Sequence, residues 1–108
     1  MNKLPQTITE YVEATNAREP ERAAACFHED ATVHDEGSTR HGRKEIAAWV
    51  AETGERYSAT MEPTGLEETD GRHILRATVR GSFPGSPVTL NFNFLLRSGS
   101  IQSLEIKP

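Results

Sequence analysis

Asp35 is the side chain whose type and position in this sequence are best suited to chemistry. Residues 31–35 alternate so that Asp35 shares one strand face with Ala31 and Val33, and we expect this face to point toward the core. A carboxylate at the end of an apolar face is poorly solvated unless a donor meets it, and desolvation raises its pKa. A carboxyl group in that state can act as a general base that removes a proton from carbon.

A structural role explains the same residue equally well. Asp35 immediately precedes Glu36 and Gly37, and an Asp at the end of a strand often forms an Asx-turn or caps the following loop. In that role the anionic carboxylate would stabilise the turn and take no part in chemistry. The sequence leaves both roles open.

The histidines and the single cysteine carry weaker signals. The spacing of His28, His34 and His41 matches no metal-binding template, and His34 lies on the opposite strand face from the apolar residues, so we expect no metal site. His73 lies on the inward-facing register at the start of its strand, where it could serve at a pocket rim as a second acid or base. Cys26 lies in an apolar run, which favours a buried thiol, and no intramolecular disulfide can form.

The elements that must position these side chains begin with three predicted helices. The first ends at about residue 16, the second starts at Pro20 and ends near residues 28–30, and the third runs from Arg43 to Gly54. Residues at helical spacing define their inward stripes: Ile8, Tyr11, Val12 and Thr15; Ala23, Ala24 and Phe27; Ile46, Trp49, Val50 and Thr53.

Strands dominate the rest of the chain. A short strand at 31–35 precedes a loop at 36–42, and strands at 57–61, 72–83, 88–97 and 101–106 follow the third helix, with turns at 63–65, 70–71, 84–87 and 98–99. Such a sheet has one apolar face, which only the helices can cover. A curled sheet with helices across its mouth leaves a cavity.

Two motifs carry a resemblance to a known family. Residues 30–35 read Asp-Ala-Thr-Val-His-Asp, and residues 41–43 read His-Gly-Arg at the start of a helix. This arrangement resembles the nuclear transport factor 2 superfamily, and within it the SnoaL-like and ketosteroid-isomerase-like branch. The resemblance implies one α+β domain over residues 1–108, a cone-shaped barrel in which three N-terminal helices pack on a curled mixed or antiparallel sheet. Because that fold hosts isomerases, dehydratases, cyclases, hydrolases and inert binders, it specifies no single function.

The resemblance also implies roles for particular residues. Matched without gaps, Asp35 falls on the proton-abstracting Asp of ketosteroid isomerases and Tyr11 on their oxyanion-stabilising Tyr. A phenol in a dry pocket can donate to a developing enolate oxygen, although Tyr11 also fits a plain amphipathic core position. Phe92 stands where those isomerases carry a protonated Asp as a second donor. The loss of one such donor costs about 10²–10³ in rate, which argues against steroid isomerisation itself.

The predicted pocket binds a small hydrophobic molecule. Its proposed lining is Val33, Trp49, His73, Phe83 and Phe92, and the three aromatic rings are also explicable as ordinary core. One hypothesis is a cofactor-free isomerase or lyase in which Asp35 transfers a proton next to a carbonyl. The other is a catalytically inert binding domain in which Asp35 is structural. A subunit that serves only for assembly fits less well.

Composition limits the partners. Of 108 residues, 35% are hydrophobic and 6% aromatic, and so lean a core favours burial against a second copy. The outer sheet face would suit a homodimer interface through Asn91, Asn93 and Leu95. A stripe of arginines on a strand face forms either part of that interface or an anion site: Arg72, Arg76 and Arg80. A net charge of −4 argues against nucleic acid. No run resembles a signal peptide or could span a bilayer, which predicts a cytoplasmic protein with no membrane partner.

Overall fold

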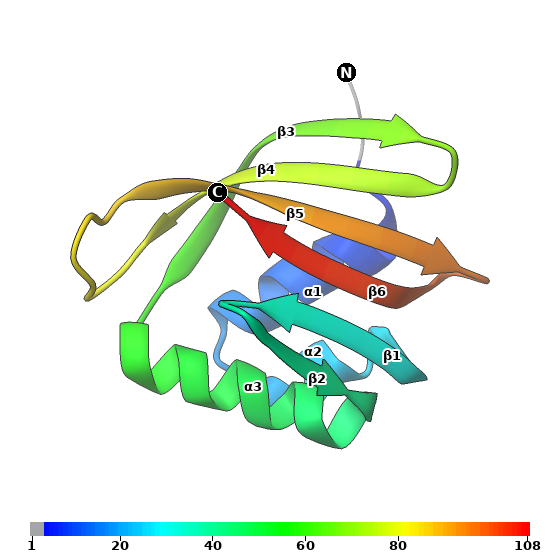
Figure 1. The fold of residues 1–108 in the computed structure, drawn as a ribbon, viewed down its shortest axis with the longest axis horizontal. Coiled ribbons are helices and arrows are strands. Elements are labelled where there is room, and N and C mark those ends of the chain that lie inside the picture. Colours follow the sequence, from blue (N-terminus) through cyan, green and yellow to red (C-terminus); the bar gives the residue numbers. More distant parts are fainter. Residues whose placement is uncertain (1–3) are drawn as a thin grey trace.

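A six-stranded sheet lies across three helices in the computed structural model, which describes residues 4–108 (Figure 1). The sheet curls, and the helices gather on one side of it. The elements are α1 (Gln6–Asn16), α2 (Pro20–Ala24), β1 (Phe27–Asp35), β2 (Ser38–His41), α3 (Gly42–Tyr57), β3 (Thr60–Thr69), β4 (Arg72–Arg80), β5 (Val88–Arg97) and β6 (Ser100–Lys107).

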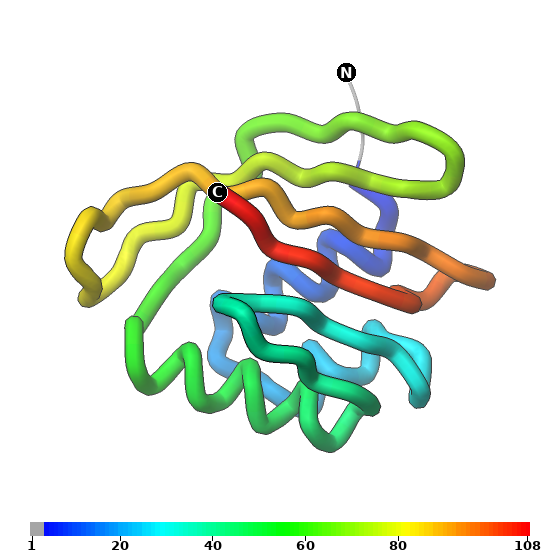
Figure 2. Tube along the Cα trace, viewed as in Figure 1, coloured from blue at the N-terminus to red at the C-terminus, as the bar shows by residue number. Residues whose placement is uncertain are grey.

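The sheet is mixed, with the strand order β2-β1-β6-β5-β4-β3. The four strands β3 to β6 form an antiparallel meander, while β1 pairs in parallel with β6 and in antiparallel with β2. Figure 2 shows how the chain reaches β1 early and returns beside it only at its end. The predicted cone-shaped α+β fold is confirmed, except that the sheet stays open between its edge strands β2 and β3 and is not a closed barrel.

Tyr11 anchors the helical layer to the sheet. Its ring is 1% exposed and meets Phe27 of β1 and Phe94 of β5 edge-on, with ring centroids 5.7 and 5.6 Å apart. Such aromatic pairs contribute beyond the area that they bury. The predicted inward stripes are confirmed for these buried residues: Ile8, Tyr11 and Val12 on α1, Ala23 and Ala24 on α2, and Ile46, Trp49 and Val50 on α3.

Two predicted helix ends were wrong. The second helix stops at Ala24, because the Cys26 carbonyl accepts from the Ile101 N–H and pairing with β6 then takes over, so that Phe27 begins β1. The third helix continues past Gly54 to Tyr57. No helix within residues 4–108 has the length and apolar character needed to cross a membrane.

Two predicted loop segments belong to strands. Residues 36–42 were expected to form a loop, but β2 pairs with β1 across a tight turn at Glu36 and Gly37, both of which have positive φ (53° and 77°). An exposed polar edge strand carries no apolar alternation, so periodicity could not predict it. Pro63 and Gly65 were expected to end a strand, whereas they flank an irregularity inside β3.

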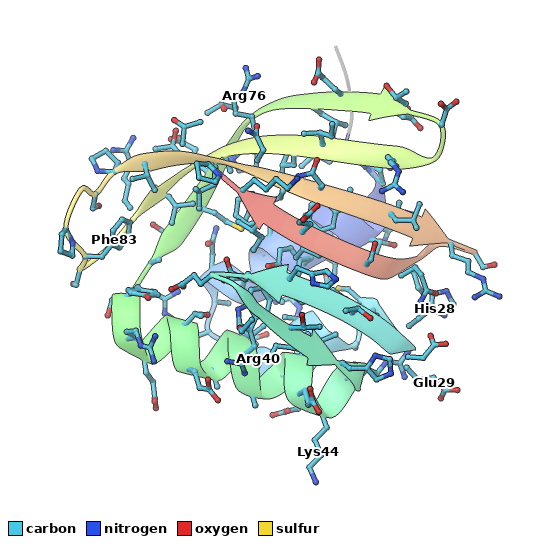
Figure 3. The ribbon with its side chains drawn as sticks, in the orientation of Figure 1. His28, Glu29, Arg40, Lys44, Arg76 and Phe83 are labelled. Carbon is cyan, nitrogen blue, oxygen red and sulfur yellow. The ribbon has the colours of Figure 1, made fainter. Side chains whose placement is uncertain are left out.

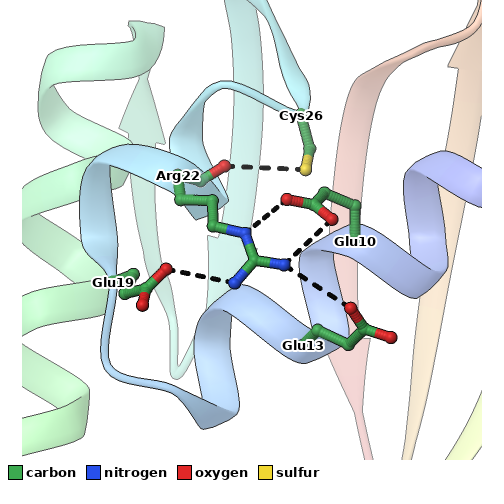
Figure 4. A network of polar contacts seen from close by, with 5 residues as sticks. All are labelled: Glu10, Glu13, Glu19, Arg22 and Cys26. Atoms are coloured by element: carbon green, nitrogen blue, oxygen red, sulfur yellow. Dashed lines mark hydrogen bonds and ion pairs between the residues drawn. The ribbon is translucent and has the colours of Figure 1, made fainter.

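Arg22 fastens α2 to α1 (Figure 4). Its guanidinium contacts the Glu10 carboxylate with two nitrogens and also pairs with Glu19 at 3.0 Å and Glu13 at 3.5 Å. These partly exposed pairs add little stability each, but they fix where α2 lies. Burial raises the pKa of the neighbouring Cys26 thiol to about 11, so at neutral pH it is protonated and a poor nucleophile.

The tight contact at Gly81 yields a first prediction. A Cβ at Gly81 would lie 2.4 Å from the Tyr57 carbonyl oxygen and 3.0 Å from the Ala59 Cα. We expect Gly81→Ala to lower the free energy of unfolding by about 1–3 kcal/mol, because backbone must move to admit the methyl group. Urea denaturation measures this change. Gly65→Ala is the control, since nothing lies within 4 Å of its added Cβ, and an equal loss in both variants would contradict the explanation.

The outer sheet face yields a second prediction. Arg76 of β4 projects from the sheet (Figure 3) and lies opposite Asn91, while Arg72 lies opposite Leu95. Because the core is lean, we expect two copies to pack through this face. Sedimentation at micromolar concentration should then give twice the chain mass of 12.0 kDa. A mass of one chain would contradict the prediction.

Candidate active site

A cavity of about 810 Å³ opens between the sheet and the helices. Its walls come from α1, α3, the turn between β1 and β2, and the ends of β3 to β6 that lie nearest α3. Phe83 lines it from the connection between β4 and β5 (Figure 3). This volume is within the range of pockets that enclose small organic ligands.

Asp35 lies on the wall of this cavity at the end of β1. One carboxylate oxygen, Oδ2, accepts a hydrogen bond of 3.1 Å from the indole Nε1 of Trp49, a residue of α3 that is 5% exposed. The alternation along β1 places Asp35 on the face of the buried Ala31 and Val33, as predicted. The carboxylate is therefore held by a neutral donor at the boundary between core and cavity.

The pKa of Asp35 is raised from its ordinary value. Desolvation by burial is the largest cause, and the nearby charge of Glu36 acts in the same direction. The Trp49 hydrogen bond, the Glu36 backbone and the Arg40 charge oppose the shift. The net effect is a carboxylate that binds a proton more readily than a free Asp does, which suits a base that must later return the proton.

Tyr11 lines the same cavity from α1. Burial raises the pKa of its phenol, and the Asp35 charge adds to that effect, while the neighbouring Thr15 hydroxyl lowers it. Tyr11 is therefore a neutral phenol that can donate one proton in a hydrogen bond. The structure thus brings to one cavity the two residues that the resemblance paired.

Three of the other predicted ligand-binding residues line the cavity, and two do not. Trp49, Phe83 and Phe92 are on its wall. Val33 is fully buried beneath it. His73 is also buried, but at the other end of β4, where its Nε2 lies 3.1 Å from Glu68 Oε2. His73 is thus not at the pocket rim. The alternation of residues along β4 predicted its inward face correctly, but the cavity lies toward the opposite end of the strand.

Sequence reasoning missed the polar contacts at the rim of the cavity. The Asn16 side chain both donates to and accepts from the Met61 backbone, each at 2.9 Å, which ties α1 to β3. The Tyr57 hydroxyl bonds the Glu36 carboxylate at 3.1 and 3.3 Å, and the Tyr57 ring meets Phe83 edge-on. No spacing in the sequence signals these contacts, because each joins segments that are far apart in the chain.

A second, smaller cavity adjoins Asp35. Its volume is about 150 Å³, and it is bordered by polar side chains that include Ser38, Arg40 and Arg56. Arg40 pairs with Glu52 of α3 at 3.1 Å, and Figure 3 shows Arg40 between β2 and α3. Asp35 and Trp49 border both cavities. Asp35 therefore lies between an apolar cavity on one side and a small polar one on the other.

The four histidines have separate partners. His28 bonds the Arg97 carbonyl at 2.7 Å and His34 the Thr39 hydroxyl at 3.1 Å, while Thr32 Oγ1 lies 3.4 Å from His41 Nδ1. In the part of the chain that the structure describes, no three His, Cys, Asp or Glu side chains gather as metal ligands would.

The fold is the one that solved structures describe as NTF2-like or ketosteroid-isomerase-like. The family model for the SnoaL-like domain matches residues 8–99. The chain therefore belongs to the SnoaL-like domain family.

Solved structures place the chain among similar proteins. A protein from Sinorhizobium meliloti described as a candidate polyketide cyclase is 34% identical, with a TM-score of 0.93 over 96% of this chain and 95% of that one. A second candidate polyketide cyclase, from Silicibacter, is 27% identical, with a TM-score of 0.79 over 94% and 85%. A ketosteroid-isomerase-like protein from Catenulispora acidiphila, solved with trimethylamine, is 21% identical (TM-score 0.87; 98% and 87% covered) and shares the fold. The search of curated proteins found no match to the chain.

The raised pKa of Asp35 yields a third prediction. The folded state holds the proton more tightly than the unfolded chain, so this group contributes stability below the unfolded pKa and loses it as the pH rises through the folded pKa. Asp35→Asn cannot ionise and still accepts from Trp49. We therefore expect its melting temperature to equal or exceed that of the wild type at neutral pH, and the gap to close at about pH 3.

Thermal melts across this pH range measure the difference, with Asp70→Asn as control, because Asp70 is exposed in the turn between β3 and β4. A turn-capping role for Asp35 predicts the opposite result. The variant would then lose up to about 1 kcal/mol at neutral pH.

Proposed function

We propose that this protein is a cofactor-free enzyme that transfers a proton at the carbon next to a carbonyl group of a small, mostly apolar molecule. The observation that carries the proposal is the placement of a partly desolvated carboxyl group, Asp35, and a buried neutral phenol, Tyr11, on the wall of one cavity. Asp35 acts as the base, and Tyr11 donates to the carbonyl oxygen.

The reaction begins when Asp35 removes the proton. The electron pair of the C–H bond moves into the enolate, and the negative charge that builds on oxygen is stabilised by the Tyr11 hydrogen bond. Asp35, now protonated, can return the proton to a different carbon, which is an isomerisation. Alternatively, the enolate carbon attacks a second carbonyl of the same molecule, a carbon–carbon bond forms, and the resulting alkoxide takes the proton from Asp35. That outcome is a cyclisation.

The names of the similar proteins support cyclisation as the closer analogy. Both outcomes share the same first step, so the residues alone favour the step and not the product. Phe92, which is 5% exposed and lines the cavity, adds apolar surface and no donor. A substrate of flat apolar rings with one carbonyl near Tyr11 fits this distribution of polar groups.

The second candidate function is binding without catalysis. The observation that favours it is the Trp49 hydrogen bond to Asp35, which gives the carboxylate a structural task in holding the indole at the cavity wall. In this case the cavity would enclose the same kind of apolar molecule, and replacing Asp35 would affect ligand affinity only slightly.

Hydrogen exchange on a simple ketone tests the proposal and yields a fourth prediction. In deuterated buffer, we expect the protein to accelerate exchange of the acidic protons of β-tetralone, followed by NMR. Asp35→Asn should reduce the acceleration by about 10²-fold or more, because the base is lost, while Asp70→Asn should leave it unchanged. Binding of β-tetralone, read from Trp49 fluorescence, without accelerated exchange would favour the binding function. Equal exchange rates for the wild type and Asp35→Asn would exclude Asp35 as the base.

A further inference from the structure

The Thr15 hydroxyl is a buried polar group whose environment is unusual. Thr15 lies in the last turn of α1 and lines the cavity, yet its Oγ1 has no hydrogen-bond partner among the described residues. Buried hydroxyls are nearly always paired, and the exceptions often occur at functional sites.

Thr53 of α3 shows what a helical threonine beside this cavity ordinarily does. Its hydroxyl donates back to the helix, to the Trp49 carbonyl at 2.9 Å and the Val50 carbonyl at 3.3 Å. This back-bonding is the usual solution for Thr inside a helix. Thr15 has the same option at its own helix and does not use it. Its hydroxyl is therefore free to serve another group.

The group beside it is the Tyr11 phenol. Residues four apart lie one above the other on a helix face, and both side chains border the same cavity. The Thr15 hydroxyl is close enough to lower the Tyr11 pKa against the larger effect of burial, although it lies outside ordinary hydrogen-bond geometry. The Tyr11 ring is fixed by its edge-on contacts with Phe27 and Phe94, so a bond between the two hydroxyls depends on the orientation of the threonine side chain.

In the proposed chemistry, a contact between the Thr15 hydroxyl and the Tyr11 phenol would stabilise negative charge. A phenol that donates to an oxygen acquiring negative charge becomes more negative itself, and a second donor to the phenol oxygen strengthens the chain of hydrogen bonds. Phe92 supplies no donor on the opposite wall. Because the Thr15 oxygen is buried, a molecule in the cavity would be affected by it only through Tyr11.

We propose that Thr15 is a positioning residue whose hydroxyl donates to the phenol oxygen of Tyr11 when that phenol donates to a ligand oxygen. The inference rests on the proposed function of the cavity and adds a relay, from Thr15 through Tyr11 to the ligand, in place of a second direct donor. It applies to ligands whose oxygen carries negative charge, such as an enolate, more than to neutral ones.

The experiment uses Asp35→Asn as the starting protein, because the amide mimics the protonated base that faces an enolate. The probes are β-naphthol, a flat ring with an ionisable oxygen, and naphthalene, which lacks the oxygen. Their affinities are measured by Trp49 fluorescence, at a pH where β-naphthol is partly ionised. Adding Thr15→Val, which removes the hydroxyl and keeps the shape, should weaken β-naphthol binding by about tenfold and change naphthalene binding by less than about twofold. Thr15→Ser should restore β-naphthol binding.

The control is Thr9→Val, the same substitution on the same helix away from the cavity lining. It should leave both affinities unchanged. We expect the melting temperature of Thr15→Val to equal or exceed that of its parent, because an unpartnered hydroxyl is removed. Equal loss of both probes, or no loss of either, would overturn the relay while leaving the cavity a binding site. Failure of both probes to bind the starting protein would overturn the relay and the proposed function together.

Discussion

The packing of Tyr11 between Phe27 and Phe94 is the contact on which the rest of the site depends. It joins α1 to β1 and to β5, which lie on either side of β6 in the sheet. The same ring that fills the core carries its hydroxyl toward the cavity, so the position of the donor is set by the packing of the core. A site built in this way is rigid, because the ring cannot move without opening the contact between helix and sheet.

The cavity lies where the curled sheet is not filled by helices. Its walls include α1, α3 and the ends of β3 to β6 nearest α3, while α2 contributes nothing to it. Polar contacts then hold the rim. Asn16 ties α1 to β3, Arg18 donates to the Ala59 carbonyl, and Tyr57 reaches Glu36 across the turn between β1 and β2. These rim groups are paired within the chain, whereas the Thr15 hydroxyl beside the cavity is not.

Asp35 is balanced between opposing influences. Burial favours its neutral form, while the Trp49 indole favours the anion. The Glu36 backbone and the Arg40 charge also favour the anion, yet burial outweighs all three and the pKa remains above its ordinary value. A small cavity with polar side chains adjoins the carboxylate on its other side. These features are the ones on which the proposed role of Asp35 as a base rests.

The sequence alone indicated three helices and an antiparallel meander and the face on which most core residues lie, because these follow from the local period of apolar residues; the two motifs at 30–35 and 41–43 then indicated the family's fold. Helical spacing predicted that Tyr11 and Trp49 face inward, and strand alternation predicted the same for Asp35 and His73. Periodicity carries no information about depth along an element, so it could not show that His73 lies away from the cavity. The polar edge strand β2 was not predicted for a related reason, since an exposed strand has no apolar period. The hydrogen bond from Trp49 to Asp35, the open hydroxyl of Thr15 and the polar rim were decided only by the tertiary structure, because each depends on which distant segments the folded sheet brings into contact.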